Sequence, residues 1–195
     1  VLFIAVVVLL SALLLNVVFR SLLVPVKAAL MNLLSIGAAL GVVTLVFQEG
    51  WGASLLGIEP GPIEPFLPVM MFAIIFGLSM DYEVFIVSRI REEFVATGDP
   101  RGAVRTGLAA TGRVVTAAAA IMISVFGSFM IGAEDRTIMM FGLGLATAVF
   151  LDAFLIRVIL LPAVMDIASH ATWWLPSWLD RGMPHIGVEG PAPEP

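Results

Sequence analysis

The chain has 195 residues, of which 60% are hydrophobic and 13% are charged. With a mean hydropathy of +1.06, this balance excludes an ordinary soluble domain and indicates an integral membrane protein. The net charge of -5 comes from acids scattered through the connections and the tail, so it does not indicate a cationic partner, and we expect no nucleic-acid partner. Cysteine is absent, and His170 and His185 both lie near the C-terminus. We therefore expect no enzyme active site, metal or cofactor.

Five apolar segments are long enough to cross a bilayer core of about 30 Å, which takes about 20 helical residues. They cover residues 1–18, 28–47, 66–88, 114–131 and 138–165, and the last is long enough to tilt. These segments predict an all-α membrane protein whose transmembrane bundle occupies residues 1–168. Val1 lies inside the first segment, with neither an initiator methionine nor a polar flank of the signal-peptide kind. We therefore expect a fragment that continues upstream.

The basic residues indicate the orientation of the chain. The first connection contains Arg20 and Lys27, and the third, residues 89–113, contains five arginines. The second connection has three glutamates and no basic residue, and the fourth has only Arg136 beside two acids. By the positive-inside rule, the first and third connections and the C-terminus, with Arg181, are cytoplasmic. The N-terminus of the fragment then lies on the extracytoplasmic side of the cell membrane.

The third connection and the tail carry local signals. The Gly-Asp-Pro sequence at residues 98–100 is typical of a helix stop, an N-cap and an N1 proline, which predicts two short helices in a cytoplasmic hairpin over residues 89–113. In the tail we expect an interfacial aromatic segment over residues 169–182 and, because proline and glycine follow, a disordered tail over residues 183–195. Three tryptophans are interpreted as an aromatic belt rather than a binding site: Trp173, Trp174 and Trp178.

Asp81 is the most unusual residue of the apolar spans. It lies about 20 Å along its helix at 1.5 Å per residue, near the middle of the membrane, where a carboxylate costs about 2.5 to 3.5 kcal/mol on insertion scales. Acids at this depth usually face a bundle interior and mark an ion or proton path. The alternative is a neutral aspartate that serves only as a hydrogen-bond partner between helices. Because Tyr82 and Glu83 follow directly, the site is more polar than that alternative requires.

A second acid, Asp152, lies at comparable depth in the fifth span. Gly144, Ala148 and Asp152 recur every four residues, which places the acid on a face of small residues that can approach another helix closely. Gly77 stands in the same relation to Asp81. The fourth span has a similar seam, made of Gly112, Thr116, Ala120, Ser124 and Ser128. Three helices thus offer narrow, weakly polar faces that suit a packed interior with a buried proton route, although small residues also serve packing alone.

Arg157 follows Asp152 by five residues and has three candidate roles. It can extend to the cytoplasmic interface, neutralise Asp152, or form an ion pair with an acid on a neighbouring helix. Residues five apart are separated by about 140° around an α-helix, so a direct pair with Asp152 on the same helix is expected to be strained. Extension to the interface and an interhelical pair are favoured equally.

The Asp-Tyr pair is part of a longer pattern. The chain reads GLSMDYEVFIVSRIREEF, then TGRVVTAAAAIMISVFGSF, then FGLGLATAVFLDAFLIRVILLPAVMDI, and closes with WWLPSW. In this order, and over nearly the whole chain, these stretches resemble the last five helices of an MMPL transporter of the resistance-nodulation-division (RND) superfamily.

The resemblance implies a proton-driven exporter of lipids or other hydrophobic and amphipathic compounds. Such a protein has two homologous six-helix halves, each with a large extracytoplasmic porter domain after its first helix, and this chain would lack that helix and that domain. Asp81 and Tyr82 match the family's Asp-Tyr pair, which meets the pair of the other half and carries protons. The implied partners are membrane lipid, the missing N-terminal half and porter domains, and a lipid-like or drug-like substrate. The proton gradient takes the place of a cofactor.

The resemblance also indicates which half this chain represents. Five residues are expected to support the relay: Glu83, Asp152, Arg157, Thr116 and Ser124. Glu83 and the acid and arginine of the last helix look like the C-terminal half. First halves of the family commonly carry a serine six residues after the glycine of a TGR-type motif, whereas this chain has Ala118 there. This departure favours the C-terminal half, and it means that this half supplies no such serine.

Two other functions fit some of the same residues. Two intramembrane aspartates, Asp81 and Asp152, would suit an intramembrane aspartyl protease, but that family has Tyr-Asp on one helix and Gly-x-Gly-Asp on the other. Here the order is Asp-Tyr, and Leu145 follows Gly144. An accessory protein of protein translocation with the RND fold is a closer alternative, which the porter domain would distinguish.

Overall fold

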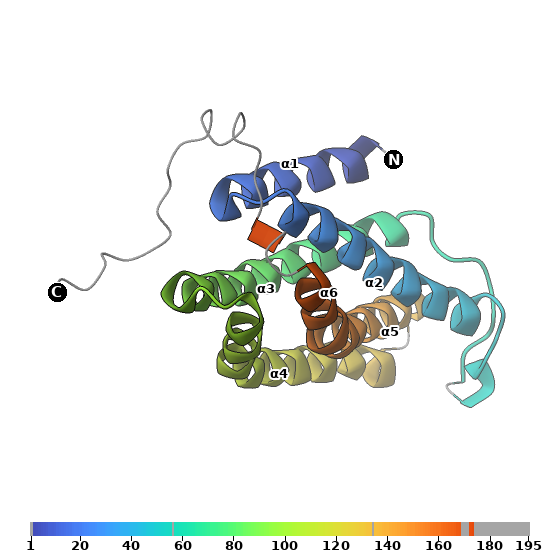
Figure 1. The fold of residues 1–195 in the computed structure, drawn as a ribbon. Helices are drawn as coiled ribbons and strands as arrows, with labels where there is room; N and C mark the ends of the chain where they lie inside the picture. The colour runs from blue at the N-terminus through green and yellow to red at the C-terminus, as the bar shows by residue number, and fades with distance from the viewer. Residues whose placement is uncertain (1, 56, 134, 169–171, 174–195) are drawn as a thin grey trace. The chain divides into compact units, whose positions relative to one another are not determined.

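The computed structural model describes residues 2–55, 57–133, 135–168 and 172–173. Figure 1 shows these residues as a series of helices, and no strand occurs among them. The elements in chain order are α1 (Leu2–Phe19), α2 (Leu23–Phe47), the 3-10 turn η1 (Ala53–Leu55), α3 (Leu67–Thr97), α4 (Pro100–Gly132), α5 (Arg136–Phe150), the π-helical η2 (Leu151–Leu160) and α6 (Leu161–Ala168).

Five helices among the described residues are long and apolar enough to span a membrane. They are α1, α2, α3, α4 and the continuous helix Arg136–Ala168, which α5, η2 and α6 form together. Many of their large apolar side chains are exposed, including Leu9, Ile121 and Val158. Such exposure is unfavourable in water but not in lipid, whose tails are as apolar as leucine. The prediction of an all-α membrane protein with five spans is confirmed, and the chain is a multi-pass membrane protein.

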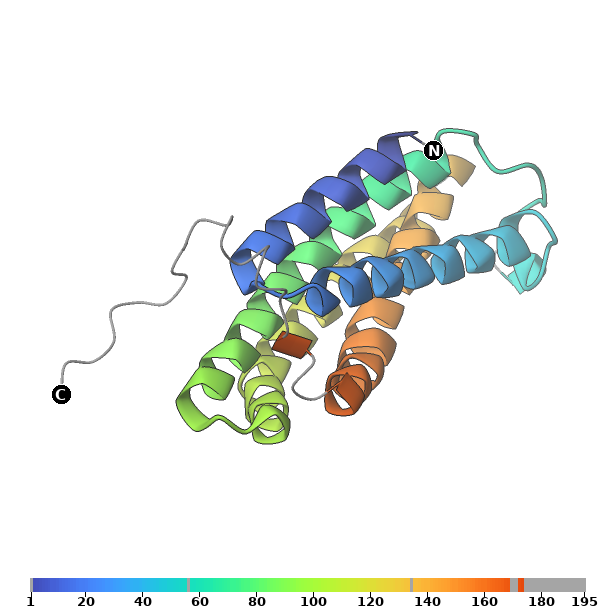
Figure 2. The same ribbon diagram turned by 45° about the horizontal axis from the view of Figure 1, so that its top comes forward.

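The third connection differs from its prediction. A helical hairpin does occupy residues 89–113, but its arms are the end of α3 and the start of α4 rather than two separate short helices. The arginines, glutamates and alanines after the apolar segment of α3 favour helix, so the helix continues past the span. Gly98 and Asp99 form the turn as predicted: Gly98 has a φ of 69°, and Asp99 Oδ1 accepts a hydrogen bond from the Arg101 N–H. Figure 2 shows this tight turn in green.

Contacts divide the chain into two units. One unit consists of residues 31–82 and 112–160, and the other of residues 1–30, 83–111 and 161–195. In the first unit, a buried cluster joins Ala119 of α4 to Val149 and Ala153 of the last span. Gly142 brings α5 against α4, because a Cβ at this position would lie 2.8 Å from the Phe126 carbonyl oxygen.

The small-residue face of the last span is also buried in the first unit. A Cβ at Gly144 would lie 3.0 Å from Val43 Cγ2 on α2, and the Ala148 carbonyl accepts a hydrogen bond from Ser35 Oγ at 3.2 Å. The predicted close helix approach on this face is therefore confirmed. Gly37 and Gly41 of α2 behave differently, because nothing lies within 4 Å of a Cβ at either position.

In the second unit, Trp173 packs against the end of α3. Its ring stacks on Phe94 with a centroid distance of 5.5 Å, and the Arg91 guanidinium lies 5.5 Å from its ring centre. Arg91 also donates a hydrogen bond to the Phe19 carbonyl at the end of α1. Trp173 is thus part of the protein's packing rather than a free member of an aromatic belt. Other parts of the tail prediction lie outside the described residues: Trp174, Trp178 and residues 183–195.

Arg136 holds the second connection to the start of α5. Its Nη2 donates to the carbonyls of Phe47 at 2.9 Å and Gly61 at 2.5 Å, and its Nη1 donates to the Pro62 carbonyl at 3.0 Å. A Cβ at Gly61 would lie 3.2 Å from Arg136 Nη1, so glycine leaves room for the guanidinium. The Phe47 carbonyl belongs to the last residue of α2 and the other two lie in the connection, so one side chain joins the end of α2, the connection and the start of α5.

Candidate functional site

Asp152 and Arg157 form a buried ion pair within one helix. Arg157 Nε donates to Asp152 Oδ2 at 2.9 Å, and Asp152 is 4% exposed and Arg157 2% exposed. Both residues lie in η2, which is a π-helix. Because the backbone bonds of a π-helix join residues five apart, side chains five apart lie on the same face. The expectation of a strained same-helix pair assumed an α-helix and is wrong, and Arg157 does not extend to the interface.

The ion pair is also held by neighbouring helices. Ser79 Oγ on α3 lies 2.9 Å from Asp152 Oδ1, 3.0 Å from Arg157 Nη2 and 2.5 Å from Asn32 Oδ1 on α2. Arg157 Nη2 donates a further hydrogen bond to the Ser79 carbonyl. Asn32 donates its amide to Met80 Sδ at 3.3 Å. Arg157 therefore has an interhelical partner, as one of its candidate roles required, but this partner is a serine rather than an acid.

Tyr82 borders the same cluster. Its ring centre lies 5.3 Å from the Arg157 guanidinium carbon, within the range of a cation-π contact. Its hydroxyl lies 3.4 Å from Met122 Sδ on α4. The structure thus brings Tyr82, Asp152 and Arg157 together in one polar network.

Asp81 has different surroundings from Asp152. Its side chain is exposed, and no hydrogen bond or ion pair reaches it from the residues that the structure describes. Gly77, one turn earlier on α3, has nothing within 4 Å of where a Cβ would lie. The face of α3 that carries these two residues is therefore open in this chain.

Glu83 belongs to a second buried ion pair. Lys27 Nζ lies 3.1 Å from Glu83 Oε1, and the two residues are 5% and 4% exposed, respectively. Lys27 was predicted to lie in the first connection, but α2 begins at Leu23, so Lys27 lies inside the helix. A charge buried at this level requires a partner. The pair with Glu83 supplies that partner.

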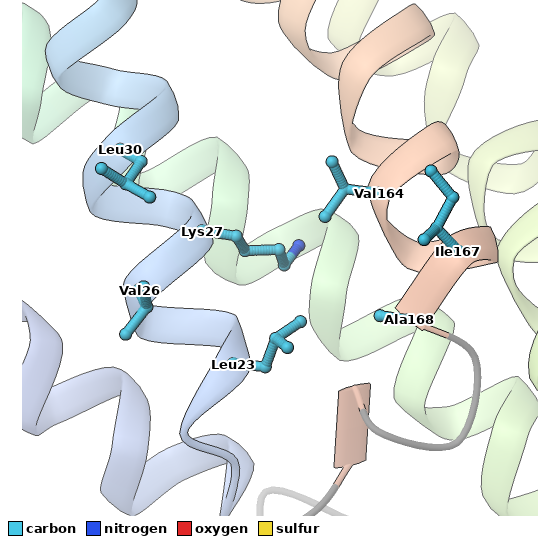
Figure 3. Close-up of a pocket in the computed structure, with 7 residues that line it drawn as sticks. All are labelled: Leu23, Val26, Lys27, Leu30, Val164, Ile167 and Ala168. Atoms are coloured by element: carbon cyan, nitrogen blue, oxygen red, sulfur yellow. The ribbon is translucent and has the colours of Figure 1, made fainter.

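Lys27 also lines an apolar groove of about 300 Å³. Figure 3 shows the residues of α2 that form one wall and those of α6 that form the other: Leu23, Val26, Lys27 and Leu30 on α2, and Val164, Ile167 and Ala168 on α6. The lining is hydrocarbon apart from the Lys27 side chain, whose ammonium group bonds to Glu83. The groove thus offers an apolar surface beside a neutralised ion pair.

Thr116 and Ser124 do not join either ion pair. Both side chains are exposed on α4, and Ser124 Oγ donates to the Ala120 carbonyl of its own helix at 2.8 Å. Among the residues that the structure describes, no hydrogen bond links Thr116 or Ser124 to Asp152 or Tyr82. The α4 seam is therefore an exposed surface in this chain, like the Asp81 face of α3.

Three polar residues of these sites were missed in the sequence: Asn32, Ser79 and Lys27. Asn32 and Ser79 lie inside apolar spans, so the criterion that singled out Asp81 would have found them. Lys27 required the true start of α2. Across the described part of the chain, no three His, Cys, Asp or Glu side chains gather as metal ligands would.

Comparison with known proteins identifies the family. The model of the MMPL family matches residues 1–185. This chain belongs to the MMPL family. The family resemblance expected from the Asp-Tyr motif and its neighbouring stretches is thereby confirmed.

Individual relatives extend this finding. Membrane protein YdfJ of Bacillus subtilis is 47% identical to this MMPL chain over 178 residues, which are 91% of this chain and 24% of that protein. The mycolic acid-containing lipids exporter MmpL11 of Mycolicibacterium smegmatis is 39% identical over 186 residues, 95% of this chain and 19% of that protein. The trehalose monomycolate exporter MmpL3 of the same species is 40% identical over 174 residues, 87% of this chain and 17% of that protein. The chain therefore spans no more than 24% of the length of these relatives.

Proposed function

We propose that this chain forms one half of the membrane domain of a proton-driven exporter of lipid-like or amphipathic compounds. The observation that carries the proposal is the position of Asp81, a carboxylate in the middle of an apolar span whose face is open in this chain. An intramembrane acid of this kind marks a proton or ion path by default. The open face suits the Asp-Tyr pair of a second half, against which Asp81 would exchange its proton.

The polar network on η2 gives Asp81 a route to move helices. Asp81 directly precedes Tyr82 in α3, the Tyr82 ring lies against the Arg157 guanidinium, and Arg157 bonds to Asp152. Uptake of a proton by Asp81 removes its negative charge and so changes the balance of forces on Tyr82 and Arg157. Tyr82 belongs to α3 and Arg157 to η2, so the change would favour a different packing of these two helices. In the whole protein, this movement would be passed to the porter domains.

The substrate class follows from the relatives. Two of them are named as exporters of mycolic acid-containing lipids and of trehalose monomycolate, so we infer an amphipathic, lipid-like substrate for the whole protein. The partners would be membrane lipid, the other half and its porter domains. The chain would act as a transporter rather than an enzyme, and the proton gradient would supply the energy.

The proposed orientation places the hairpin at Gly98 in the cytoplasm and the connection at residues 50–64 outside the cell membrane. A reporter inserted at each position of the full-length protein tests this. The positive-inside rule predicts labelling from outside only at residues 50–64, because the hairpin arms contain Arg89, Arg91 and Arg101. The opposite labelling would reverse the direction of proton flow.

The function itself is tested with Asp81→Asn in the full-length protein. The substitution keeps the size of the side chain and much of its hydrogen-bonding capacity but cannot take up a proton. A relay predicts lost proton-driven export in proteoliposomes, with insertion and abundance near those of the wild type. The matched control is Asp99→Asn, the same exchange at an exposed N-cap, where asparagine caps equally well.

If Asp81 only joined helices, asparagine would replace it, since such interhelical contacts contribute about 0.6 to 2 kcal/mol, and export would continue. Tyr82→Phe gives a second measurement, because it removes the hydroxyl and little volume. A proton route that uses this hydroxyl predicts slower export. Wild-type export by Asp81→Asn would rule out the relay.

A further inference from the structure

The Ser79 hydroxyl is shared among more groups than one hydrogen can serve. Its oxygen lies 2.5 Å from Asn32 Oδ1 and 2.9 Å from Asp152 Oδ1, both of which are acceptors when Asp152 is ionised. Arg157 Nη2, at 3.0 Å, can only donate to it. A serine hydroxyl has one hydrogen and accepts two hydrogen bonds. Ser79 therefore donates to Asn32 or to Asp152, but never to both at once.

Two hydrogen-bond patterns fill the Ser79 hydroxyl completely, and they differ in the charge of Asp152. When Asp152 is protonated, its O–H donates to Ser79 Oγ, and the hydrogen of Ser79 turns to Asn32 Oδ1. When Asp152 is ionised, Ser79 donates to the carboxylate, and Asn32 must turn its amide so that Nδ2 donates to Ser79. Arg157 donates to Ser79 in both patterns. Ser79 itself gains and loses no proton.

Asn32 is sensitive to this change because it is 3% exposed. In the orientation of the structure its Oδ1 faces Ser79 and its Nδ2 donates to Met80 Sδ at 3.3 Å. A buried amide has no water to replace a lost hydrogen bond. When the Ser79 hydroxyl stops donating to Asn32, the Asn32 amide must therefore take a new orientation. Asn32 belongs to α2, whereas Ser79 belongs to α3 and Asp152 to η2. The reversal would thus reach a third helix.

We propose that Ser79 is a positioning residue that passes the protonation state of Asp152 to Asn32 on α2 by reversing its single hydrogen bond. The proposal deepens the proposed function, on which it rests: it extends the path of the proton from Asp81 to Asp152. The contacts of the described residues place two ionisable side chains beside Asp152: Arg157 bonds to it directly, and Tyr82 lies against Arg157. Asp81 directly precedes Tyr82 in the chain. Residues 31–47 of α2 contain no ionisable side chain. Asn32 is therefore the responding group on that helix.

Infrared difference spectroscopy of the purified full-length protein between low and high pH tests the first link. Asp152→Asn identifies the carbonyl band of protonated Asp152. Ser79→Ala is expected to move that band, because the carboxyl group loses its hydrogen-bond partner, and Ser79→Thr is expected to restore it. The matched control is Ser35→Ala, which also removes a buried interhelical hydrogen bond, but one to the Ala148 backbone carbonyl, and it should leave the band in place.

The second link is measured in the same spectra. An amide band that Asn32→Ala removes should change between low and high pH in the wild type and should stop changing in Ser79→Ala. An unmoved Asp152 band in Ser79→Ala, or an Asn32 band that ignores pH in the wild type, would overturn the proposal. If Ser79→Ala is too unstable to purify, Ser79→Cys, whose thiol donates weakly, is expected to move the band in the same direction.

Transport separates this inference from the proposed function. In proteoliposomes, Ser79→Ala should slow proton-driven export by about tenfold, the upper end of what one net hydrogen bond contributes, and Ser79→Thr should recover most of the rate. Equal loss in Ser79→Ala and Ser79→Thr would contradict the role of the hydroxyl. If the wild-type protein exports nothing in response to a proton gradient, the proposed function fails, while the infrared bands still decide the role of Ser79.

Discussion

Two arginines of this chain are held by groups of different kinds. Arg157 bonds to the carboxylate of Asp152 and to the hydroxyl and carbonyl of Ser79. Arg136 bonds to three backbone carbonyls, those of Phe47, Gly61 and Pro62. A carboxylate can take up a proton and lose its charge, whereas a peptide carbonyl cannot. The surroundings of Arg157 can therefore change state, and those of Arg136 are fixed.

This difference makes the partners of Arg157, but not those of Arg136, sensitive to protonation. Arg136 acts as a permanent clasp on the second connection, since none of its partners titrates in water. Arg157 sits where a single proton decides whether its partner is an ion. The predictions below test whether the two arginines differ in this way.

The largest effect is expected from Arg157→Met. It leaves the Asp152 charge buried without its arginine, and breaking a buried pair in this way costs about 3 to 5 kcal/mol. Adding Asp152→Asn should recover most of the loss, because the double variant buries no charge. Thermal unfolding of the purified full-length variants measures both. Equal stability of the single and double variants would mean that the pair contributes no charge interaction.

A smaller effect is expected from Arg136→Met. The variant removes the arginine donor of three carbonyls, of which Phe47 keeps the Gly61 N–H as a second donor. Arg136 is only half-buried, so water can replace part of the loss. We expect a cost of about 1 to 3 kcal/mol, as for a buried acceptor left unsatisfied. Unlike the Arg157 variant, no acid-to-amide exchange should rescue it, since no carboxylate bonds to Arg136 among the described residues. Rescue by Asp135→Asn would show that the clasp depends on charge after all.

Gly61→Ala tests the same contact by changing the residue against which the Arg136 guanidinium lies. A Cβ at Gly61 would lie 3.2 Å from Arg136 Nη1, so the guanidinium must shift slightly. Because that group is the end of a flexible side chain, the loss should stay below the figure of about 1 to 3 kcal/mol for overpacking a rigid core. Gly41→Ala is the control with the opposite sign: nothing lies near it, and alanine inside a helix gains about 0.5 to 1 kcal/mol over glycine. Equal unfolding temperatures of the Gly61→Ala and Gly41→Ala variants would contradict a close contact between Gly61 and Arg136.

The sequence predicted the helical membrane class and the residues Tyr82, Asp152 and Arg157, because apolar length and polar exceptions are both visible in it. It failed on their geometry. The pairing of Asp152 with Arg157 depends on the π-helical form of η2, whereas the prediction rested on the α-helical period. Pro162 was a usable signal: it has no N–H to bond the carbonyl of Val158, four residues earlier, so regular α-helix is interrupted there.

Other residues were beyond reach for a different reason. Nothing in a single sequence says that Arg136 binds carbonyls at the end of α2 and in the connection, because its partners are backbone groups that every residue carries. The Lys27–Glu83 pair joins residues far apart in the chain, and both look like ordinary flanking charges beside a span. The part of every predicted site residue in a proton relay remains a prediction: Asp81, Tyr82, Glu83, Asp152, Arg157, Thr116 and Ser124.

The smallest effect is expected at Asp135, which caps α5 next to Arg136. Its carboxylate accepts hydrogen bonds from the backbone N–H groups of Thr137 and Ile138, and these lower the pKa of Asp135 below its ordinary value. A lowered pKa means that the ionised form stabilises the folded state. This contribution is present above about pH 4, the ordinary range of aspartate, and is lost as the pH falls through the lower pKa of the folded state.

Asp135→Ala should therefore lower the unfolding temperature slightly at pH 7, and the difference from the wild type should shrink as the pH is lowered below about 4. Asp135→Asn keeps an acceptor oxygen at the cap, so it should lose less stability and show less dependence on pH. The cap is fully exposed to solvent, which keeps its effect below that of the arginine variants. A larger loss than in Arg136→Met would mean that the cap, and not the arginine beside it, holds the start of α5 to the second connection. A difference from wild type that grows toward low pH would contradict the sign of the pKa shift.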